Sequence, residues 1–306
     1  MSLEATLTRL LAPTAGSSAE SVGAFLREAG DRTRDLTREA DRALLGGRLA
    51  DRLGFAFAAG YQAALRALFG ERARAGLSLA ATEAGGAHPR AISTALVPAA
   101  DGGFVLDGEK VWITLAEQAA SFVVIAREGE AAGRPLLRAA IVPKDRDGVA
   151  LHPLPAPPFC PEIEHARVTF SNVRVRSDDL LEGDGYERYL KPFRTVEDTH
   201  VLCAVVGYVL GVARDDAVGR ALTERLAALA VTARACALED PTSAPLHVAL
   251  GGVFAELGAL EPEIEAALQR AGRDAHGRWV RDKGLLGVAA RARAQRLARA
   301  WERLER

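Results

Sequence analysis

The sequence predicts an α+β protein in three parts: N-terminal helices, a central antiparallel β barrel or sandwich, and a C-terminal four-helix bundle. Three observations support this class. Alanine-rich sequence with helical spacing runs from Met1 to about Leu77, and short runs rich in Val, Ile, Thr and aromatic residues follow it. Helical spacing then returns near Gly185 and continues to the end. The expected domain boundaries are 1–77, 78–180 and 181–306.

The N-terminal part has the pattern of a small helical domain. Its segment AFAAGYQAALRALFG places Phe57, Tyr61, Leu65 and Phe69 four residues apart, which puts all four on one face of a helix. Ser18 or Ser21 is expected to cap the helix that contains AFLREAG, because serine is a preferred N-cap residue.

The central part contains about six predicted strands. They are STALVPA, FVLDGEKVWIT, SFVVIAR, LLRAAIVP, GVALHPL and ARVTFSNVRV, separated by turn-forming segments such as AADGG and DRDG. No helical pattern lies between them, so an antiparallel sandwich or barrel is favoured over a doubly wound sheet.

The C-terminal part predicts four long helices with short connections, which pack most simply as an antiparallel bundle. They run from about Tyr189 to Val218, Leu222 to Leu238, Leu246 to Arg270 and Gly277 to Leu304, with EDPTSAP and AGRDAHG as breaks. The longest apolar run, Val201 to Ala213, is shorter than the roughly 20 residues that cross a bilayer, so it predicts a buried helix and no membrane span. The arginines from Arg291 to Arg306 predict a solvated helix face.

Composition excludes several classes of function. The formal net charge of −1 is unlike that of nucleic-acid-binding proteins, which carry clustered basic charge. Cys160, Cys203 and Cys236 lie far apart and the six histidines show no ligand spacing, so we expect neither disulfides nor a metal site. The N-terminus lacks the order of a secretory signal, which favours a cytoplasmic location.

Three segments carry a resemblance to a known family. They are LSLAATEAGG (Leu77 to Gly86), DGGFVLDGEKVWIT (Asp101 to Thr114) and VTFSNVRVRSDDLLEGDGY (Val168 to Tyr186). In this order and separation they resemble the acyl-CoA dehydrogenase family of flavoproteins. The resemblance implies the same order of helices, β domain and helical bundle. It also implies FAD, an acyl-CoA-type substrate oxidised at its Cα–Cβ bond, an electron-accepting flavoprotein, and a homodimer or homotetramer.

The resemblance also implies a set of cofactor-binding residues. It assigns Trp112, Ile113 and Thr114 of the WIT strand, and Thr82 of the TE turn, to the flavin ring. A flavin oxidant needs a flat apolar wall and hydrogen-bond donors at its polar edge. Strand periodicity places Trp112 and Thr114 on one face and Ile113 on the other. The alternative is that Trp112 is an ordinary core aromatic.

A carboxylate base is needed to remove the α-proton in this chemistry. The glutamate that most of the family carries late in the bundle is not recognisable here. A minority of the family places it on the first bundle helix, where Glu197 of RTVEDTHVLCAVVGY is the candidate. The alternative is that Glu197 is an acid in the first turn of that helix, with Asp198 or Thr195 as the cap.

The sequence also departs from the family pattern. The serine that helps to hold the FAD pyrophosphate falls where this chain has Gly86-Ala87-His88, and the segments that reach the adenosine are not reproduced. The chain is therefore interpreted as a shortened, divergent relative. The alternative function is that of a non-catalytic paralogue, acting as a binding or assembly module without bound flavin.

Overall fold

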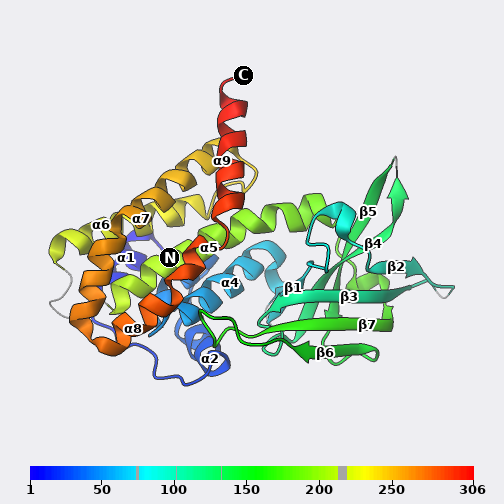
Figure 1. Cartoon of the computed structure of the whole chain (residues 1–306), viewed down its shortest axis with the longest axis horizontal. Helices are drawn as coiled ribbons and strands as arrows, with labels where there is room; N and C mark the ends of the chain where they lie inside the picture. The colour runs from blue at the N-terminus through cyan, green and yellow to red at the C-terminus, as the bar shows by residue number, and fades with distance from the viewer. Residues whose placement is uncertain (74–75, 101, 132, 213–218) are drawn as a thin grey trace. The chain divides into compact units, whose positions relative to one another are not determined.

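The computed structural model describes residues 1–73, 76–100, 102–131, 133–212 and 219–306. Within it the chain forms two compact units. The helical unit comprises Met1–Ala67, Pro158–Glu162 and Thr195–Arg306, and the sheet unit comprises Leu68–Pro157 and Ile163–Arg194. The predicted class, with helices before and after a central sheet, is confirmed (Figure 1). The division into three domains at residues 77 and 180 stays a prediction.

The α-helices follow the predicted order along the chain. They are α1 (Leu3–Leu11), α2 (Val22–Arg32), α3 (Glu39–Leu49), α4 (Leu53–Phe69), α5 (Lys191–Val212), α6 (Arg220–Cys236), α7 (Ala244–Ala271), α8 (Arg273–Asp282) and α9 (Ala290–Leu304). Ser21 caps α2 by accepting a hydrogen bond from the backbone N–H of Ala24, which confirms one of the two predicted caps.

Helix α3 packs against α5 at glycine positions. A Cβ atom on Gly47 would lie 1.9 Å from the carbonyl oxygen of Ala204, and one on Gly207 would lie 2.0 Å from the carbonyl oxygen of Leu44. Only glycine permits backbones to approach this closely. These contacts join an N-terminal helix to a C-terminal helix inside one core.

The C-terminal helices differ from the prediction in two places. The expected break AGRDAHG is confined to Gly272, whose φ of 139° ends α7, and α8 begins at the next residue. The last predicted helix is instead interrupted by a 3-10 turn at Lys283–Gly287, because Gly284 and Gly287 are weak helix formers. The predicted end of the first bundle helix, Val218, lies outside the described residues.

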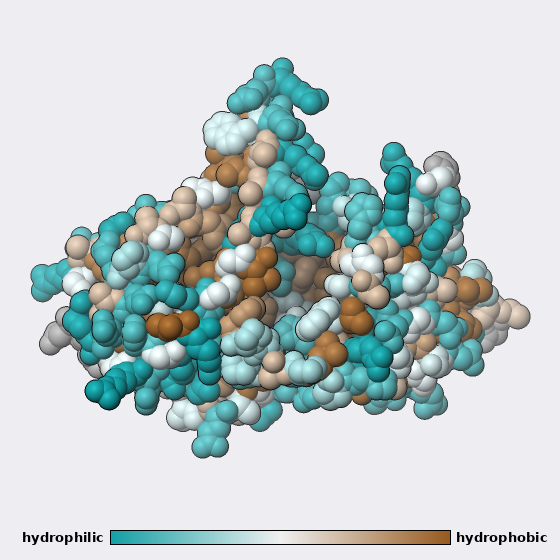
Figure 2. Space-filling model, in the orientation of Figure 1, coloured by the Kyte–Doolittle hydropathy of each residue, from teal (hydrophilic) through white to brown (hydrophobic). Residues whose placement is uncertain are grey.

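The arginines of α9 do not all face solvent, so that prediction was wrong in part. The side chains of Arg293 and Arg296 form ion pairs with the buried Asp198 of α5. The surface over the last turns of α9 is mostly hydrophilic (Figure 2).

One helix, Tyr186–Val212, is long and apolar enough to cross a membrane by length and composition alone. It includes the π-helical turn Tyr186–Leu190 that precedes α5, so it is longer than the apolar run in the sequence. In the structure 72% of its most apolar window is buried, as in the core helix of a globular protein.

The described strands form one curled, seven-stranded sheet (Figure 1). They are β1 (Leu77–Ala80), β2 (Ala95–Pro98), β3 (Phe104–Thr114), β4 (Ser121–Ala131), β5 (Arg134–Pro143), β6 (Val149–Pro153) and β7 (His165–Val175). The order is β1-β4-β2-β3-β7-β6, with β5 also paired to β4. Most pairs are antiparallel, as expected. Strand β1, which the sequence analysis missed, pairs in parallel with β4, and β2 also meets β4 in parallel.

Candidate functional site

A β-bulge lies near the end of β3. Lys110 pairs with Val168 and Ile113 pairs with Ala166, so Val111 and Trp112 together stand opposite one residue of β7. Trp112 has a φ of 57°, a left-handed conformation that is rare for a bulky side chain. Bulges are common beside active sites, where they redirect a side chain. The bulge therefore marks this end of β3 as a candidate site.

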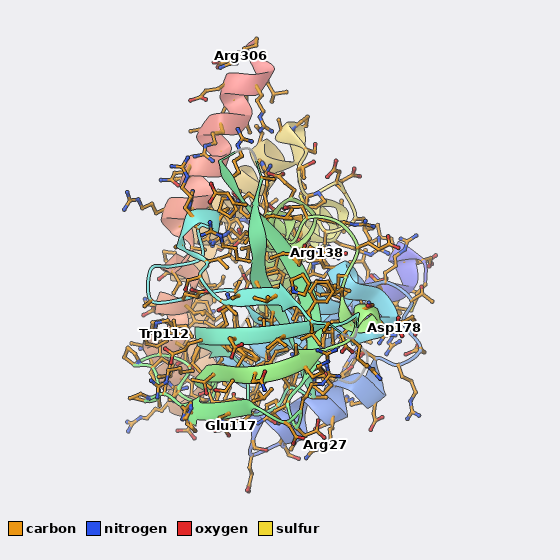
Figure 3. The ribbon with its side chains drawn as sticks, turned by 90° about the vertical axis from the view of Figure 1, so that its right-hand side faces the viewer. Arg27, Trp112, Glu117, Arg138, Asp178 and Arg306 are labelled. Carbon is orange, nitrogen blue, oxygen red and sulfur yellow. The ribbon has the colours of Figure 1, made fainter. Side chains whose placement is uncertain are left out.

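The bulge turns Trp112 away from the sheet core. Its side chain is 61% exposed, whereas Ile113 is 1% exposed and packs within the core of the sheet. Figure 3 shows Trp112 and Asp178 at opposite ends of the β3–β7 pair. The interpretation of Trp112 as a core aromatic is therefore wrong. Because the side chain of Ile113 is buried, only its backbone could contact a cofactor.

The TE turn lies directly beside the bulge. The backbone N–H of Val111 donates a 2.8 Å hydrogen bond to the carbonyl oxygen of Thr82. Thr82 and Thr114 are both half-buried, and within the described part of the chain neither hydroxyl has a hydrogen-bond partner. The structure thus brings together Trp112, Thr114 and Thr82, with two hydroxyl groups available to a ligand.

A buried ion pair fixes the TE turn to β3. Lys110 is 0% exposed, and its Nζ lies 2.7 Å from Oε1 of Glu83, the residue after Thr82. Glu83 also accepts hydrogen bonds from the backbone N–H groups of Ser93 and Thr94 and from both of their hydroxyls. Both residues lie in segments that carry the family resemblance, LSLAATEAGG and DGGFVLDGEKVWIT, but no role was predicted for them. The signal was a lysine at an inward position of an apolar strand, which requires a buried counter-ion.

The pKa values of this pair are shifted by its surroundings. Burial alone raises the pKa of Glu83, but the bonds from Lys110, Ser93 and Thr94 outweigh it and lower the pKa to about 2. Burial lowers the pKa of Lys110 to about 8, against the opposing effect of Glu83. Both groups are therefore charged at neutral pH.

The candidate base lies elsewhere in the chain. Glu197 is on α5 in the helical unit, whereas Trp112, Thr114 and Thr82 belong to the sheet unit. Glu197 is half-buried and has an interaction partner. Helix α5 begins at Lys191, so Glu197 lies in its second turn and neither Thr195 nor Asp198 is a cap. The capping interpretation is therefore wrong.

The sheet site fits one side of a flavin ring. An exposed indole on a rigid strand supplies a flat apolar surface, and the hydroxyls of Thr82 and Thr114 supply hydrogen-bonding groups next to it. A plain sheet would not hold a large aromatic in a left-handed conformation facing outward, because both features cost free energy.

Comparison with known proteins relates the chain to acyl-CoA dehydrogenases. Residues 78–173 match the family model of the acyl-CoA dehydrogenase middle domain. Comparison with curated proteins gave no match. Among solved structures, the chain is similar to butyryl-CoA dehydrogenase from Megasphaera elsdenii, with 16% identity, a TM-score of 0.66, and coverage of 98% of this chain and 97% of that one.

Two further structures extend the comparison. FkbI, described as acting in the biosynthesis of a methoxymalonyl extender unit, has 17% identity and a TM-score of 0.65, with 97% of this chain and 98% of that chain covered. TdsC from Paenibacillus sp. A11-2, solved with FMN and indole, has 19% identity and a TM-score of 0.61, with 94% and 84% covered. The fold of the chain is thus the acyl-CoA dehydrogenase fold. Within this fold, residues 78–173 carry the acyl-CoA dehydrogenase middle domain.

Proposed function

We propose that the protein is a flavin-dependent oxidoreductase that uses FAD to oxidise the Cα–Cβ bond of an acyl-CoA-type thioester. One observation carries the proposal: Trp112, 61% exposed on a bulge with a left-handed backbone, stands beside Thr114 and Thr82 in a segment that matches the acyl-CoA dehydrogenase middle domain. In that position the Trp112 side chain adds little packing stabilisation to the fold, whereas a planar ligand would bury it.

Each residue of the site has a distinct task in this proposal. When bound, the flavin supplies the hydride acceptor. Trp112 provides an apolar wall, and the hydroxyls of Thr114 and Thr82 hydrogen-bond the polar edge of the ring. Ile113 anchors the strand by its buried side chain, and Glu83 and Lys110 hold Thr82 in place.

Glu197 is proposed as the base that takes the α-proton of the thioester. The proposal rests on its position on the first long helix of the bundle, where the resemblance places the base in a minority of the family. Glu197→Gln should keep flavin binding and lose turnover. Full turnover in that variant would remove Glu197 from the mechanism.

The direct test is a visible absorption spectrum of the purified protein, before and after addition of excess FAD and desalting. Anaerobic mixing with acyl-CoAs of different chain length then follows. A flavin band that bleaches with one acyl-CoA supports the proposal. Trp112→Gly should lose the band, and Trp301→Phe, which changes an exposed tryptophan on α9, should keep it.

A protein that stays colourless after reconstitution would instead support a non-catalytic paralogue that keeps the fold as a binding module. An electron-accepting flavoprotein partner, a homodimer or homotetramer, and a cytoplasmic location stay predictions of the sequence. Size-exclusion chromatography with light scattering tests the oligomer.

A further inference from the structure

His165 lies beside the exposed tryptophan, on the neighbouring strand. It is the first residue of β7 and pairs with Thr114 of β3. The centroid of its imidazole ring lies 6.2 Å from the ring of Trp112, at an interplanar angle of 70°, which is an edge-to-face contact. All three residues belong to the sheet unit, so this contact is internal to one compact body.

The imidazole of His165 is partly buried, and burial lowers its pKa, which favours the uncharged form. His165 is half-buried, and its Nδ1 is buried without a hydrogen-bond partner in the described part of the chain. Burial lowers the pKa of His165, and only the backbone of Ile163 opposes this effect. The neighbouring Glu164 accepts hydrogen bonds from the backbone of the turn after β3.

Charged groups on the adjacent strands are engaged elsewhere. Arg167 of β7 lies 3.6 Å from Glu109 of β3 in an exposed ion pair. On β6, His152 pairs with Arg167 in the register and contacts the hydroxyl of Thr169 through its Nε2.

An exposed indole needs a lateral support to keep one orientation. The bulge fixes the backbone of Trp112, but a side chain that is mostly in solvent retains rotational freedom. Within the described residues, the edge-to-face arrangement with His165 is an aromatic contact that Trp112 makes. We propose that His165 is a positioning residue of the cofactor site, whose ring fixes the orientation of Trp112 and so prepares the wall for a planar ligand. This inference rests on the proposed flavin function.

The contact can be tested without any cofactor. The fluorescence of the protein minus that of its Trp112→Phe variant reports Trp112 alone. Because a protonated imidazole quenches a neighbouring indole, this difference should fall at acidic pH, as the pH drops through the lowered pKa of His165. The fall should be absent in His165→Phe and present in His152→Gln. A difference that is independent of pH in the parent protein overturns the contact.

The positioning role is tested by binding. His165→Ala should weaken FAD binding about tenfold, and His165→Phe should restore it to within about twofold of the parent, because phenylalanine keeps the ring. Melting temperatures of both variants control for folding. Equal affinity in His165→Ala and the parent overturns the proposal. If the parent binds no FAD, the flavin function fails, and the fluorescence titration alone decides whether His165 supports Trp112.

Discussion

Replacement of Glu83 by glutamine tests how the site is held together. Lowering of the Glu83 pKa from 4.5 to about 2 corresponds to about 3 kcal/mol of stability at neutral pH. The Glu83→Gln variant loses this stabilisation and leaves the ammonium group of Lys110 buried without a counter-ion. Breaking a buried pair typically costs about 3–5 kcal/mol, so we expect a loss of about 3 kcal/mol.

The two partners of this pair are not equivalent. Because burial lowers the pKa of Lys110 from 10.5 to about 8, its charge costs the folded state about 3 kcal/mol. Lys110→Met should therefore destabilise the protein less than Glu83→Gln does. Addition of Lys110→Met to Glu83→Gln should recover most of the loss, since it removes the unpaired charge.

The assay is thermal and urea unfolding followed by circular dichroism at several pH values. Since the folded-state pKa of Glu83 is lowered, its contribution is present above about pH 4.5 and disappears as the pH falls towards 2. The difference between parent and Glu83→Gln should follow that course. Glu109→Gln is the control. Glu109 lies next to Lys110 on β3 and forms an exposed ion pair with Arg167 of β7, so its replacement should change the stability little.

Two results would refute this reasoning. One is a Glu83→Gln variant within 1 kcal/mol of the parent at pH 7. The other is a double variant as unstable as Glu83→Gln alone, which would mean that Lys110 is not the uncompensated charge.

Two further predictions concern Trp112 and the helical unit. Trp112→Gly should have a free energy of unfolding within about 1 kcal/mol of the parent. Glycine relieves the left-handed backbone strain of about 1–3 kcal/mol, and little buried area is lost. A loss of several kcal/mol in a melting experiment would contradict this. Asp41→Asn should lower the free energy of unfolding in urea by about 3 kcal/mol, because it breaks a buried ion pair with Arg234 at 2.6 Å. Stability equal to that of the parent would show that water solvates the Arg234 charge in the variant.

Much of the fold follows from periodicity, because helices and strands bury their apolar faces with different repeats. The order of the elements and the Ser21 cap were predicted in this way. Strand β1 was missed because its four residues are too few for a period, and its parallel pairing with β4 joins segments distant in sequence.

The site was predicted only in part. The motif located Trp112, Thr114 and Thr82, but strict alternation could not predict the bulge that exposes the indole. The buried partner of Lys110 lies 27 residues away, and His165 lies on another strand. Neither contact produces a local pattern in the sequence from which it could be predicted.

The left-handed backbone at position 112 has a consequence for natural variation. In a lineage that had ceased to bind a planar ligand, selection would no longer retain tryptophan there. Glycine, asparagine or aspartate would replace it readily, because these residues adopt a positive φ at low cost and no core packing would be lost. The residue at this one position in related genomes would thus separate lineages that still use the site from those that keep only the scaffold.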